Sequence, residues 1–496
     1  MPEKFKDASP DEIDKAMQVA ARASEEFKKF SLEQRAGFMK AIAGNLENAG
    51  EQLISMAMKE THLPQARLQS EKMRTVFQLN NYAEACAKGD WMQVSMDTAD
   101  QNRTPPKPDI RKMMVPLGPV VVFGSSNFPF AYSTAGGDTA CAFAAGCPVI
   151  VKAHPAHAGT SQMVAELIME AVQTCNMPGG IFTHIHGAGI ETGKQLVLHP
   201  HTKAVGFTGS FAGGKQLFDW GNQRKVPIPV FSEMGSVNPV FLLPGKLKNS
   251  AAEVAAMYAT SITLGVGQFC TNPGLIIGIG GEELDKFIAA LGQKIKEVAP
   301  AVMLHPGIAS AFNKNKERAL GQKGVHVAAV SDVQAKENEG WPTIAFTSAQ
   351  VFLANPLLHE EVFGPYSLVI KCNSNEELLD VTKALQGQLT ATVMASVEDI
   401  HAHRSLIEAI KNICGRLLYN GVPTGVEVCL SMQHGGPFPA TTDSRFTSVG
   451  ADGIKRFARP LAFQGWPNEL LPDELKDENP LKIWRTINSK ITPPGL

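Results

Sequence analysis

A cysteine at the end of a glycine-containing turn is the first residue of this chain whose setting suggests chemistry. The stretch Leu264-Gly-Val-Gly-Gln-Phe-Cys270-Thr-Asn272 follows a run with helical spacing, Ala251 to Ile262. Its glycines allow positive φ and a close approach of the backbone to a ligand. A thiol presented in this way is a nucleophile if a neighbour takes its proton or lowers its pKa. Most free cysteines are small buried hydrophobes, so Cys270 needs partners before a catalytic role is favoured.

Glu233 and Asn127 are candidate partners because each follows an apolar, strand-like run. Glu233 comes just after Pro229-Val-Phe231. Burial raises the pKa of such an acid and suits it to general-base catalysis, although an acid paired with a lysine or with backbone donors has the same pattern. The amide of Asn127 is suited to donate a hydrogen bond to a developing oxyanion, whereas a lone turn asparagine more often caps its own loop.

Histidines occur in two further motifs. Lys152-Ala-His154-Pro-Ala-His157 follows a strand-like run, where the lysine and histidines suit a ribose or phosphate. The spacing of its histidines also permits a metal, but no cysteine or acid cluster lies beside them, so we expect no metal site. His434, in the glycine-rich loop His434-Gly-Gly-Pro, can carry a proton near neutral pH or bond to its own loop.

Two glycine-rich segments have the character of strand-to-helix turns. Gly187-Ala-Gly-Ile-Glu-Thr-Gly193 looks like a dinucleotide fingerprint, but its third glycine is one residue late, so we interpret it as the start of a helix. Gly206-Phe-Thr-Gly209-Ser210, followed by Gly213 and Gly214, offers backbone N–H groups and a helix N-terminus to a pyrophosphate. An ordinary turn is the alternative there.

Short apolar runs alternate with helical segments from Val115 to Met234. The runs that we expect to be strands are 120–123, 148–151, 181–185, 204–207 and 229–231, with helices at 159–175 and 191–198. This alternation predicts βαβ units and a parallel sheet, and ligands of such sheets bind at the carboxyl ends of the strands. A second α/β region follows, with strands at 275–279, 367–370 and 416–419 and helices near 284–298 and 375–386.

The remaining segments look structural. Residues 9–87 read as helical, starting at the capping sequence Ser9-Pro-Asp-Glu. The proline-rich stretch within 90–112 predicts either a long hairpin that forms an arm or a plain linker. The polar tail from about Ile454 is punctuated by prolines, and we expect it to cross a surface or a partner subunit.

Composition excludes several classes of protein. The chain has 496 residues, 44% of them hydrophobic and 19% charged, with a net charge of −2, so it gives no sign of nucleic-acid binding. Its eight cysteines show no paired framework. There is no apolar signal segment, and no run reaches the roughly 18 residues of a membrane span. We therefore expect a cytoplasmic protein with several domains.

Taken in order, the motifs resemble the aldehyde dehydrogenase superfamily over essentially the whole chain. They are Asn127 in Ser-Asn-Phe-Pro, Lys152 after a strand, Phe-Thr-Gly-Ser at 207–210, Glu233-Met-Gly, Gln268-Phe-Cys270 and Glu361-Val-Phe363-Gly-Pro. Finer details, including Glu233-Met-Gly-Ser-Val-Asn-Pro and His434-Gly-Gly-Pro-Phe-Pro-Ala-Thr, resemble the α-ketoglutaric semialdehyde (2,5-dioxovalerate) dehydrogenases and the related NADP-dependent fatty aldehyde dehydrogenases. Ser125-Ser-Asn127 replaces the common Pro-Trp-Asn of the superfamily, which leaves the shape of the substrate pocket open.

The resemblance implies an aldehyde dehydrogenase-like α/β fold. It has a Rossmann-type parallel-sheet cofactor domain (1–89 and 113–235), a second α/β catalytic domain (236–445), and an oligomerisation arm with the tail (90–112 and 446–496). By the same resemblance, Cys270 attacks the aldehyde to form a thiohemiacetal that is oxidised to a thioester. Asn127 holds the oxyanion, Glu233 activates the hydrolytic water, and His434 is a second proton acceptor.

For the cofactor, the resemblance implies that a pyrophosphate lies at Gly209, Ser210 and the helix containing Gly214. Lys152 and Glu361 would meet the two riboses and Phe363 the nicotinamide. Many NAD-preferring relatives have an acid three residues after the lysine, where this chain has Pro155. With Lys152 and His154 available to attract a 2′-phosphate, we expect NADP to be preferred and NAD to be the alternative.

The substrate and the assembly stay open at this point. Arg103 and Arg111 are candidates to bind a substrate carboxylate, whereas Phe128, Phe130 and Phe269 would suit a fatty aldehyde. A CoA-acylating reaction is disfavoured by the acid at Glu233, and a non-catalytic cofactor-binding or structural protein is disfavoured by the retained reactive residues. We expect a small-molecule aldehyde substrate and a homodimer or homotetramer.

Overall fold

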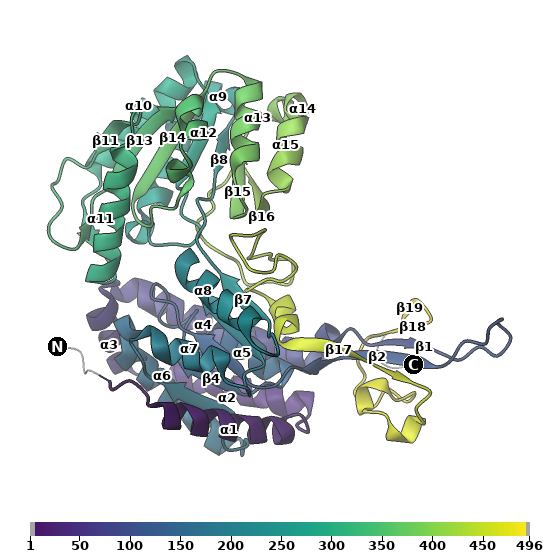
Figure 1. Cartoon of the computed structure of the whole chain (residues 1–496). Helices are drawn as coiled ribbons and strands as arrows, with labels where there is room; N and C mark the ends of the chain where they lie inside the picture. The colour runs from purple at the N-terminus through teal and green to yellow at the C-terminus, as the bar shows by residue number, and fades with distance from the viewer. Residues whose placement is uncertain (1–4, 493–496) are drawn as a thin grey trace.

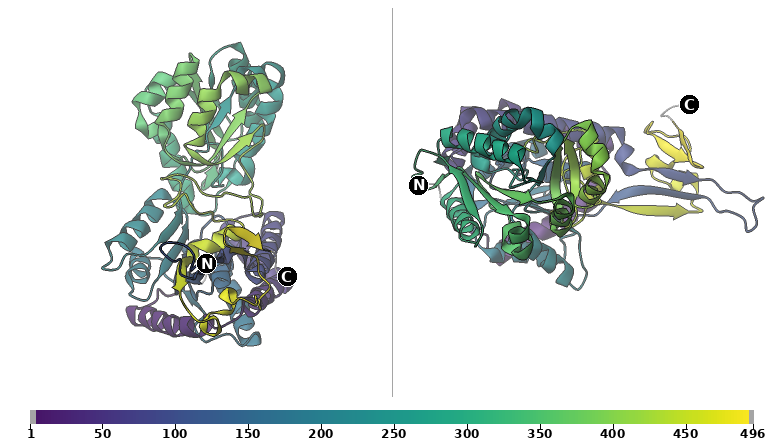
Figure 2. Two further views of the ribbon diagram at one scale, coloured as in Figure 1. Left: turned by 90° about the vertical axis from the view of Figure 1, so that its right-hand side faces the viewer. Right: turned by 90° about the horizontal axis from the view of Figure 1, so that it is seen from above.

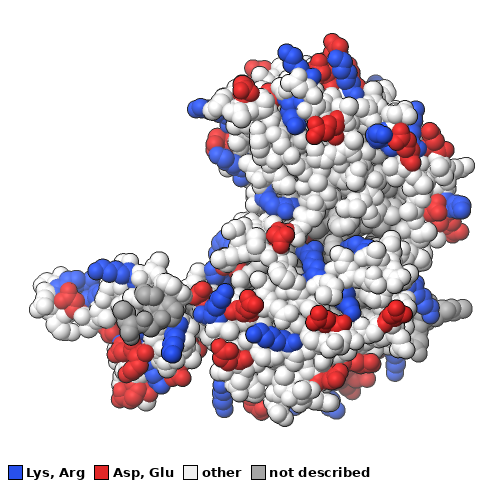
Figure 3. Space-filling model, turned by 180° about the vertical axis from the view of Figure 1, so that it is seen from behind, with Lys and Arg blue, Asp and Glu red and all other residues white. Residues whose placement is uncertain are grey.

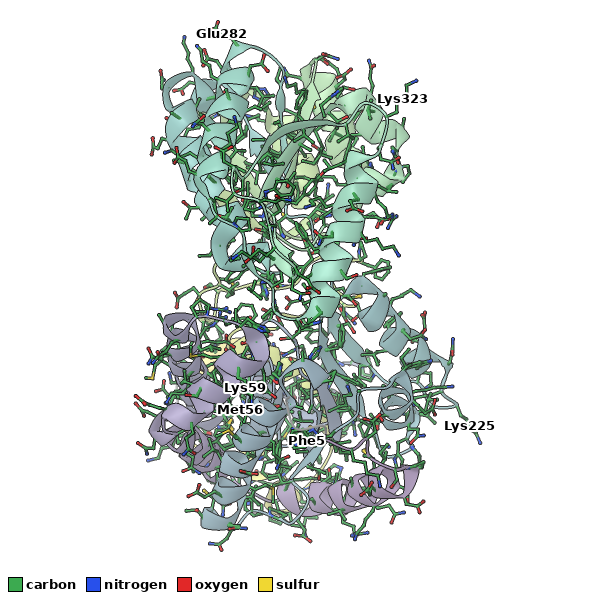
Figure 4. The ribbon with its side chains drawn as sticks, turned by 90° about the vertical axis from the view of Figure 1, so that its left-hand side faces the viewer. Phe5, Met56, Lys59, Lys225, Glu282 and Lys323 are labelled. Atoms are coloured by element: carbon green, nitrogen blue, oxygen red, sulfur yellow. The ribbon has the colours of Figure 1, made fainter. Side chains whose placement is uncertain are left out.

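The chain folds into two stacked lobes and a projecting arm. The computed structural model describes residues 5–492. In Figure 1 the lower lobe contains α1–α8, the upper lobe contains β8–β16, and the arm carries β1, β2 and β17–β19. Figure 4, a side view, shows the two lobes one above the other, with Glu282 and Lys323 at the far end of the upper lobe and Phe5, Met56, Lys59 and Lys225 in the lower lobe.

Four helices form most of the N-terminal segment, as the sequence predicts. They are α1 (Pro10–Phe27), α2 (Leu32–Asn48), α3 (Glu51–Thr61) and α4 (Gln65–Lys88). The start of α1 is fixed by a capping box, because Ser9 accepts from the N–H of Glu12 and the Glu12 carboxylate accepts from the N–H of Ser9. Helix α4 ends at Gly89, whose left-handed φ of 70° is typical of a C-terminal cap.

The lower lobe is built on a five-stranded parallel sheet in the order β5-β4-β3-β6-β7. Its strands are β3 (Val120–Phe123), β4 (Val149–Lys152), β5 (Phe182–Ile185), β6 (Ala204–Thr208) and β7 (Val230–Glu233). The helices between them are α5 (Gly137–Ala145), α6 (Ala158–Thr174), α7 (Ile190–Leu198) and α8 (Phe211–Gln223). The order of the strands reverses between β3 and β6, and nucleotides bind at such a point in Rossmann-type sheets.

Both faces of this sheet are buried, because successive apolar side chains of each strand point to opposite faces. In β3, Val121 and Phe123 pack with α1 and α8, whereas Val120 and Val122 face a larger core that includes α2, α4, α5 and α6. Because each strand is covered on both sides, its sequence is continuously apolar rather than alternating with polar residues. The predicted Rossmann-type α/β fold is confirmed.

The upper lobe contains a seven-stranded sheet in the order β11-β13-β14-β9-β8-β15-β16. All neighbours are parallel except β11, which pairs antiparallel with β13 at one edge. The strands are β8 (Val240–Leu242), β9 (Leu275–Ile279), β11 (His326–Val330), β13 (Thr343–Ser348), β14 (Tyr366–Cys372), β15 (Gln388–Met394) and β16 (Cys414–Tyr419). The covering helices are α9 (Pro244–Thr263), α10 (Glu282–Glu297), α11 (Pro306–Leu320), α12 (Ala349–Ala354), α13 (Asn375–Ala384), α14 (Val397–Ala402) and α15 (Arg404–Lys411). A short pair, β10 (Ala301–Val302) and β12 (Glu339–Gly340), lies apart from this sheet.

The arm is a third sheet made from two distant parts of the chain. Its order is β17-β2-β1-β18-β19, with β1 (Ser95–Asp97), β2 (Ile110–Pro116), β17 (Ala458–Gln464), β18 (Arg485–Ile487) and β19 (Lys490–Thr492). Because β1 and β2 are antiparallel, residues 90–112 contain the predicted hairpin rather than a plain linker. The right-hand view in Figure 2 shows this sheet extending away from both lobes.

Between the upper lobe and the arm, the chain returns to the lower lobe. The 3-10 helix η5 (Ala451–Phe457) packs against α5 of the lower lobe. The loop that leads to it, residues 433–449, therefore crosses the junction between the two lobes before β17 enters the arm. This crossing loop carries His434.

Candidate active site

Cys270 follows a tight turn at the end of α9. The turn, η3 (Leu264–Gly267), has left-handed backbone at Gly265 (φ 54°) and Gly267 (φ 65°), which glycine adopts without strain. A side chain at Gly267 would collide with the backbone carbonyl of Gly364, so glycine is required there for close packing as well. The Cys270 carbonyl accepts a 2.9 Å hydrogen bond from Nδ2 of Asn238. The thiol is therefore held on a fixed backbone.

The structure brings Cys270, His434 and Glu233 together at the junction of the lobes. Nε2 of His434 lies 3.6 Å from Sγ of Cys270 and 3.0 Å from Oε1 of Glu233. The other carboxylate oxygen of Glu233 accepts a 2.6 Å hydrogen bond from the Ser448 hydroxyl. One imidazole nitrogen thus faces both a thiol and a carboxylate, which permits proton exchange among the three groups.

Burial and charge shift the pKa values of this group in opposite directions. Burial, with the nearby Glu233 carboxylate, raises the pKa of the Cys270 thiol well above its ordinary value. Burial alone would raise the pKa of Glu233, but the charge of His434 and hydrogen bonds from His434 and Ser448 outweigh it and lower that pKa. The resting site therefore favours a thiol beside an ionised carboxylate, and thiolate formation needs a base.

The loop that carries His434 is held rigidly in this position. The N–H of His434 donates to Oγ1 of Thr447 at 2.9 Å, and the carbonyl of His434 accepts from the N–H of Ser448 at 2.9 Å. Only 1% of the His434 surface is exposed. His434 does bond to its own loop, but it does so through its backbone. Its imidazole ring is directed to Cys270 and Glu233.

Asn127 lies on the loop after β3, across from the turn that contains Cys270. Its Nδ2 donates to the carbonyl of Gln268 at 3.2 Å, which places the amide two residues from the nucleophile. Glu71 of α4 supports this loop by accepting hydrogen bonds from the N–H groups of Phe130 (2.9 Å) and Ala131 (3.0 Å). The arrangement fits the predicted oxyanion donor.

Within residues 5–492, one set of three side chains has its metal-ligating atoms close together. Glu233, Cys270 and His434 have ligand atoms within 4.8 Å of one another. Because His434 already pairs with both neighbours, proton transfer explains this set without an ion. His157, from the motif with histidine spacing, instead bonds through Nε2 to the carbonyl of Ser125 at 2.7 Å.

Helix α8 presents its N-terminus at the carboxyl edge of the lower sheet. Ser210 is exposed and caps the helix by accepting from the N–H of Gly213 at 3.2 Å. Gly209 donates its N–H to the carbonyl of Glu233 at 3.0 Å, which links this turn to the catalytic strand. A Cβ on Gly214 would lie 2.6 Å from Cγ of Met234, so glycine lets α8 approach that strand. An exposed helix N-terminus at the point of strand reversal fits a pyrophosphate.

Lys152 and His154 lie at the end of the neighbouring strand β4. Burial lowers the pKa of Lys152, while Asp7 acts in the opposite direction. His154 is half-buried, and burial together with His157, Lys152 and His305 lowers its pKa well below the ordinary value. Lys152 and His154 therefore lie side by side at this strand end, where the sequence predicts contact with a 2′-phosphate.

Glu361 and Phe363 come from the upper lobe and line a small pocket with Ser236 and Asn272. A Cβ on Gly235 would lie 2.5 Å from the Glu361 carboxylate, so this acid packs directly beside the segment that follows Glu233. Burial raises the pKa of Glu361 to about 7. With α8 and Lys152, these residues line the junction of the lobes, and they fit a dinucleotide that accepts a hydride when bound.

The segment Gly187–Gly193 is used differently, as its spacing suggests. The Asp7 carboxylate accepts hydrogen bonds from the N–H groups of Ala188 (2.9 Å) and Gly189 (3.4 Å). These amides, which would otherwise bind a phosphate, are thus occupied by a carboxylate of the chain itself. The turn starts helix α7, and the interpretation of it as a helix start is confirmed.

The molecular surface is hollowed between the two lobes, and several basic side chains lie around this hollow (Figure 3). A Rossmann-type sheet lies below this hollow, and a cysteine lies beside an imidazole and a carboxylate. Together these features define a class of enzymes, the nucleotide-dependent oxidoreductases that use a thiol nucleophile. Residues 3–439 match the aldehyde dehydrogenase family. The chain belongs to that family and is an NAD(P)-dependent enzyme that oxidises an aldehyde to a carboxylic acid.

Two curated relatives are similar over nearly the whole chain. Alpha-ketoglutaric semialdehyde dehydrogenase 2 of Azospirillum brasilense is 45% identical over 484 residues, which are 97% of this chain and 92% of that protein. Alpha-ketoglutaric semialdehyde dehydrogenase of Acinetobacter baylyi is 43% identical over 490 residues, 98% of this chain and 93% of that protein. Among solved structures, glyceraldehyde-3-phosphate dehydrogenase GapN of Methanocaldococcus jannaschii in complex with NADP has a TM-score of 0.78 at 19% identity, covering 94% of this chain and 96% of that one. That likeness supports the fold. No helix of the described residues is long and apolar enough to cross a membrane.

Sequence reasoning misplaced the candidate substrate-binding residues. Arg111 is in the arm, paired with Asp109 and Asp477, and Arg103 bonds to the carbonyl of Pro105 in the exposed loop of the arm hairpin. Both therefore serve the arm rather than the junction of the lobes.

The aromatic residues divide between two locations. Phe130 is buried in the main core, so it does not line a substrate pocket. Phe128 and Phe269 do lie near Cys270, in an apolar cluster with Tyr132 and Val428.

Other residues near Cys270 were missed entirely. They are Ser448 of the crossing loop, Tyr132 of the loop after β3, Arg67 and Arg74 of α4, and Arg416 of β16. Nothing in their local sequence distinguishes them from structural residues, because Cys270 and the other residues of the site come from distant parts of the chain.

Proposed function

We propose that this enzyme oxidises 2,5-dioxovalerate (α-ketoglutaric semialdehyde) to 2-oxoglutarate and prefers NADP to NAD. The observation that carries the chemistry is the position of His434 Nε2, 3.6 Å from the Cys270 sulfur and 3.0 Å from the Glu233 carboxylate. The substrate is supported by the two relatives of that name, which are 45% and 43% identical. Two arginines without acidic partners near Cys270 are consistent with an acidic substrate.

In the first half of the reaction, Cys270 is the nucleophile. His434 accepts its proton, and the new N–H⁺ lies between the thiolate and Glu233, where it offsets the repulsion of two nearby negative charges. Sγ then attacks the aldehyde carbon, and the Asn127 amide, together with the Cys270 N–H, stabilises the oxyanion of the thiohemiacetal. The nicotinamide of the cofactor supplies the hydride acceptor, and a thioester remains on Cys270.

In the second half, Glu233 is the general base. Its lowered pKa keeps it ionised, so it can take a proton from the water that hydrolyses the thioester. His434 shares this proton through their 3.0 Å contact. Separating oxidation from hydrolysis replaces one difficult step by two easier ones.

The cofactor preference rests on charge at the end of β4. Pro155 stands where an acid would repel a 2′-phosphate, and Lys152 is half-buried nearby. Gly209, Ser210 and the helix of Gly214 would hold the pyrophosphate, and Lys152 and Glu361 the riboses. His154 would lie beside Lys152 at the 2′-phosphate.

We also propose the division of the chain into cofactor-binding (1–89 and 113–235), catalytic (236–445) and oligomerisation (90–112 and 446–496) parts. In this division, residues 446–457 serve the active site through Ser448 and the strands from β17 onward serve the arm. A homodimer or homotetramer in the cytoplasm is the expected state.

A second candidate is the oxidation of medium-chain or long-chain fatty aldehydes. It is favoured by the apolar cluster of Phe128, Ala131, Tyr132, Val428 and Val449, against which Phe269 packs. The third candidate is a non-catalytic cofactor-binding or structural role. The Cys270→Ala variant separates it from the other two, because a structural role would survive this change whereas aldehyde oxidation would be lost.

Formation of NADPH, measured without CoA, tests the proposal. The kcat/KM for 2,5-dioxovalerate is compared with that for a long-chain aliphatic aldehyde, and each is repeated with NAD. We expect the semialdehyde to be preferred by at least about 100-fold, the range available to a site that pairs a charged group. A preference for the aliphatic chain would favour the fatty aldehyde reaction, and an equal or better kcat/KM with NAD would refute the cofactor preference.

A further inference from the structure

Three arginines surround the apolar cluster beside Cys270, and they differ in how their charges are balanced. Arg67 and Arg74 lie seven residues apart on α4, so they share a face of that helix. Arg416 comes from β16 of the upper lobe. The three guanidinium groups thus approach the junction of the lobes from opposite sides.

The charge of Arg67 is neutralised locally. Its Nη2 lies 3.2 Å from the Glu71 carboxylate, and its guanidinium lies 4.6 Å from the centre of the Phe128 ring and 5.2 Å from that of Phe269. Arg67 therefore holds the aromatic residues and the Asn127 loop in place.

Arg74 has no direct ion pair of this kind, although the charge of Glu71 acts on it from a greater distance. Within residues 5–492 it forms no ion pair, and its Nε is buried without a hydrogen-bond partner. Its Nη2 donates to the Tyr132 hydroxyl at 3.3 Å, and its guanidinium lies 5.6 Å from the centre of the Tyr132 ring. The Tyr132 ring is in turn 6.4 Å from that of His434. A cation without a direct ion pair is therefore one side chain away from the catalytic imidazole.

Arg416 reaches the same cluster from the other side. It donates to the carbonyls of Pro423 (2.7 Å) and Gly425 (3.1 Å), and its Nη1 lies 4.0 Å from Sδ of Met432, which packs against the cluster. In the described part of the chain, Arg416 also lacks an acidic partner. Its Nε is buried without a hydrogen-bond partner. Burial lowers its pKa, which nearby Cys270 and Tyr132 partly offset.

We propose that Arg74 and Arg416, with the Tyr132 hydroxyl, bind the carboxylate of the substrate at the end remote from its aldehyde. This inference rests on the proposed function, because it requires an aldehyde that carries an acid. Both arginines are half-buried, and each has a fully buried Nε–H group without a hydrogen-bond partner. A substrate carboxylate would accept from these N–H groups and supply a negative charge beside the two cations. The apolar cluster between the arginines and Cys270 then packs against the carbon chain.

The test uses three aldehydes with five-carbon chains. Pentanal lacks the carboxylate, 5-oxopentanoate has it, and 2,5-dioxovalerate has both the carboxylate and the keto group. We expect Arg74→Met to lower kcat/KM for the two acids about 100-fold, mainly through KM, and to change that for pentanal less than about threefold. Arg416→Met should lower kcat/KM for the acids more than for pentanal, with some loss on pentanal as well because Arg416 also holds the 423–432 loop. Arg74→Lys, which keeps the charge but loses the planar fork, should retain an intermediate part of the acid preference.

Arg67→Met is the matched control on the same helix. Because Arg67 holds the aromatic residues, its loss should lower activity on all three aldehydes alike. An equal loss on pentanal and on both acids in the Arg74 and Arg416 variants would overturn the proposal and assign those arginines to positioning or to thiolate stabilisation.

A second readout does not depend on turnover. Bound 2-oxoglutarate should protect Cys270 from alkylation by iodoacetamide. Arg74→Met should raise the concentration of 2-oxoglutarate needed for half-maximal protection about 100-fold. Unchanged protection would contradict the proposal. In the parent enzyme, the ratio of kcat/KM for the acids to kcat/KM for pentanal tests the proposed function. The change of that ratio in the variants tests the role of the arginines. A failure of the proposed function is therefore distinguishable from a failure of the arginine proposal. If Arg416→Met does not fold, because Arg416 also holds the 423–432 loop, Arg74→Met alone decides.

Discussion

The catalytic group combines two acids with one base in a confined space. Burial, and then the neighbouring Glu233 charge, disfavour a thiolate there, so the Cys270 pKa is raised and the thiol is the resting form. Nε2 of His434 contacts both partners, so the imidazole is placed to pass a proton between the thiol and the carboxylate.

Glu361 provides a prediction about pH at the scale of one residue. Its folded pKa of about 7 is above the ordinary 4.5, so the folded state binds the proton more tightly than the unfolded state. Ionisation therefore removes stability as the pH rises from about 4.5 to 7, and the loss is complete above that range. Glu361→Gln should raise the free energy of unfolding of the cofactor-free enzyme at pH 8, by at most about 3 kcal/mol because Glu361 is partly exposed.

Denaturant unfolding at pH 5 and pH 8 checks this expectation. The gain should be small at pH 5, where the Glu361 carboxyl is largely protonated in the folded enzyme. A gain of equal size at both pH values would show that the variant acts through packing and not through the charge.

The sequence identified reactive residues when a local pattern exposed them. Cys270 follows a glycine turn, and Glu233 and Asn127 follow buried strands, so their positions could be predicted. Ser448 and Arg74 could not. Ser448 meets Glu233 across 215 positions of the chain, and Arg74 looks like any polar residue of an amphipathic helix. Their roles depend on the tertiary fold.

Helix α4 connects the fold to the chemistry at the scale of elements. Its buried Glu71 binds two N–H groups of the segment after Asn127 and also pairs with Arg67. Burial raises the Glu71 pKa, while Arg67 and those N–H groups oppose the rise. Through one carboxylate, the helix thus supports the loop that carries Asn127, the proposed oxyanion donor.

Glu71→Ala should lower the free energy of unfolding by about 3 kcal/mol, because it leaves Arg67 and two buried N–H groups unpaired. It should also lower kcat, since the Asn127 amide loses its support. Glu84→Ala, at an exposed site on the same helix, is the control and should change stability by less than about 0.5 kcal/mol. If the two variants have similar stability, the proposed supporting role of Glu71 is wrong.

Strands of the lower sheet were predicted within two residues of their observed ends, because both faces are buried and the runs are continuously apolar. In the upper lobe, four strands of the large sheet were missed, namely β8, β11, β13 and β15. Both β13 (Thr343–Ser348) and β15 (Gln388–Met394) contain threonines that are buried in the sheet, so their sequences are less apolar than their burial would suggest. The order of strands in the sheet could not be derived either, since it depends on long crossovers.

At the scale of the whole molecule, the main feature is the projecting arm. Large apolar side chains are exposed on it, namely Trp466 (50%), Leu470 (62%), Trp484 (48%) and Ile491 (74%). A projecting sheet with such residues is typical of a surface that is covered in an assembly. We expect a second copy of the chain to cover it.

The double variant Trp484→Glu with Ile491→Glu should therefore shift the enzyme toward monomer, because two charges would have to be buried in the interface. Light scattering after gel filtration measures the mass. Val397→Glu, which replaces an exposed apolar residue of the upper lobe (60% exposed), is the matched control and should leave the mass unchanged. A monomeric parent enzyme, or an unchanged assembly in the double variant, would contradict this expectation.

The central claim is that Cys270 carries the acyl group and Glu233 releases it as the acid. A single measurement on Glu233→Gln tests both parts, namely the time course of cofactor reduction together with the intact mass of the protein. We predict a burst of about one reduced cofactor per subunit, followed by a rate at least about 100-fold below that of the parent enzyme, with an acyl group on Cys270. Steady turnover at the parental rate, with no acylated protein, would contradict the account.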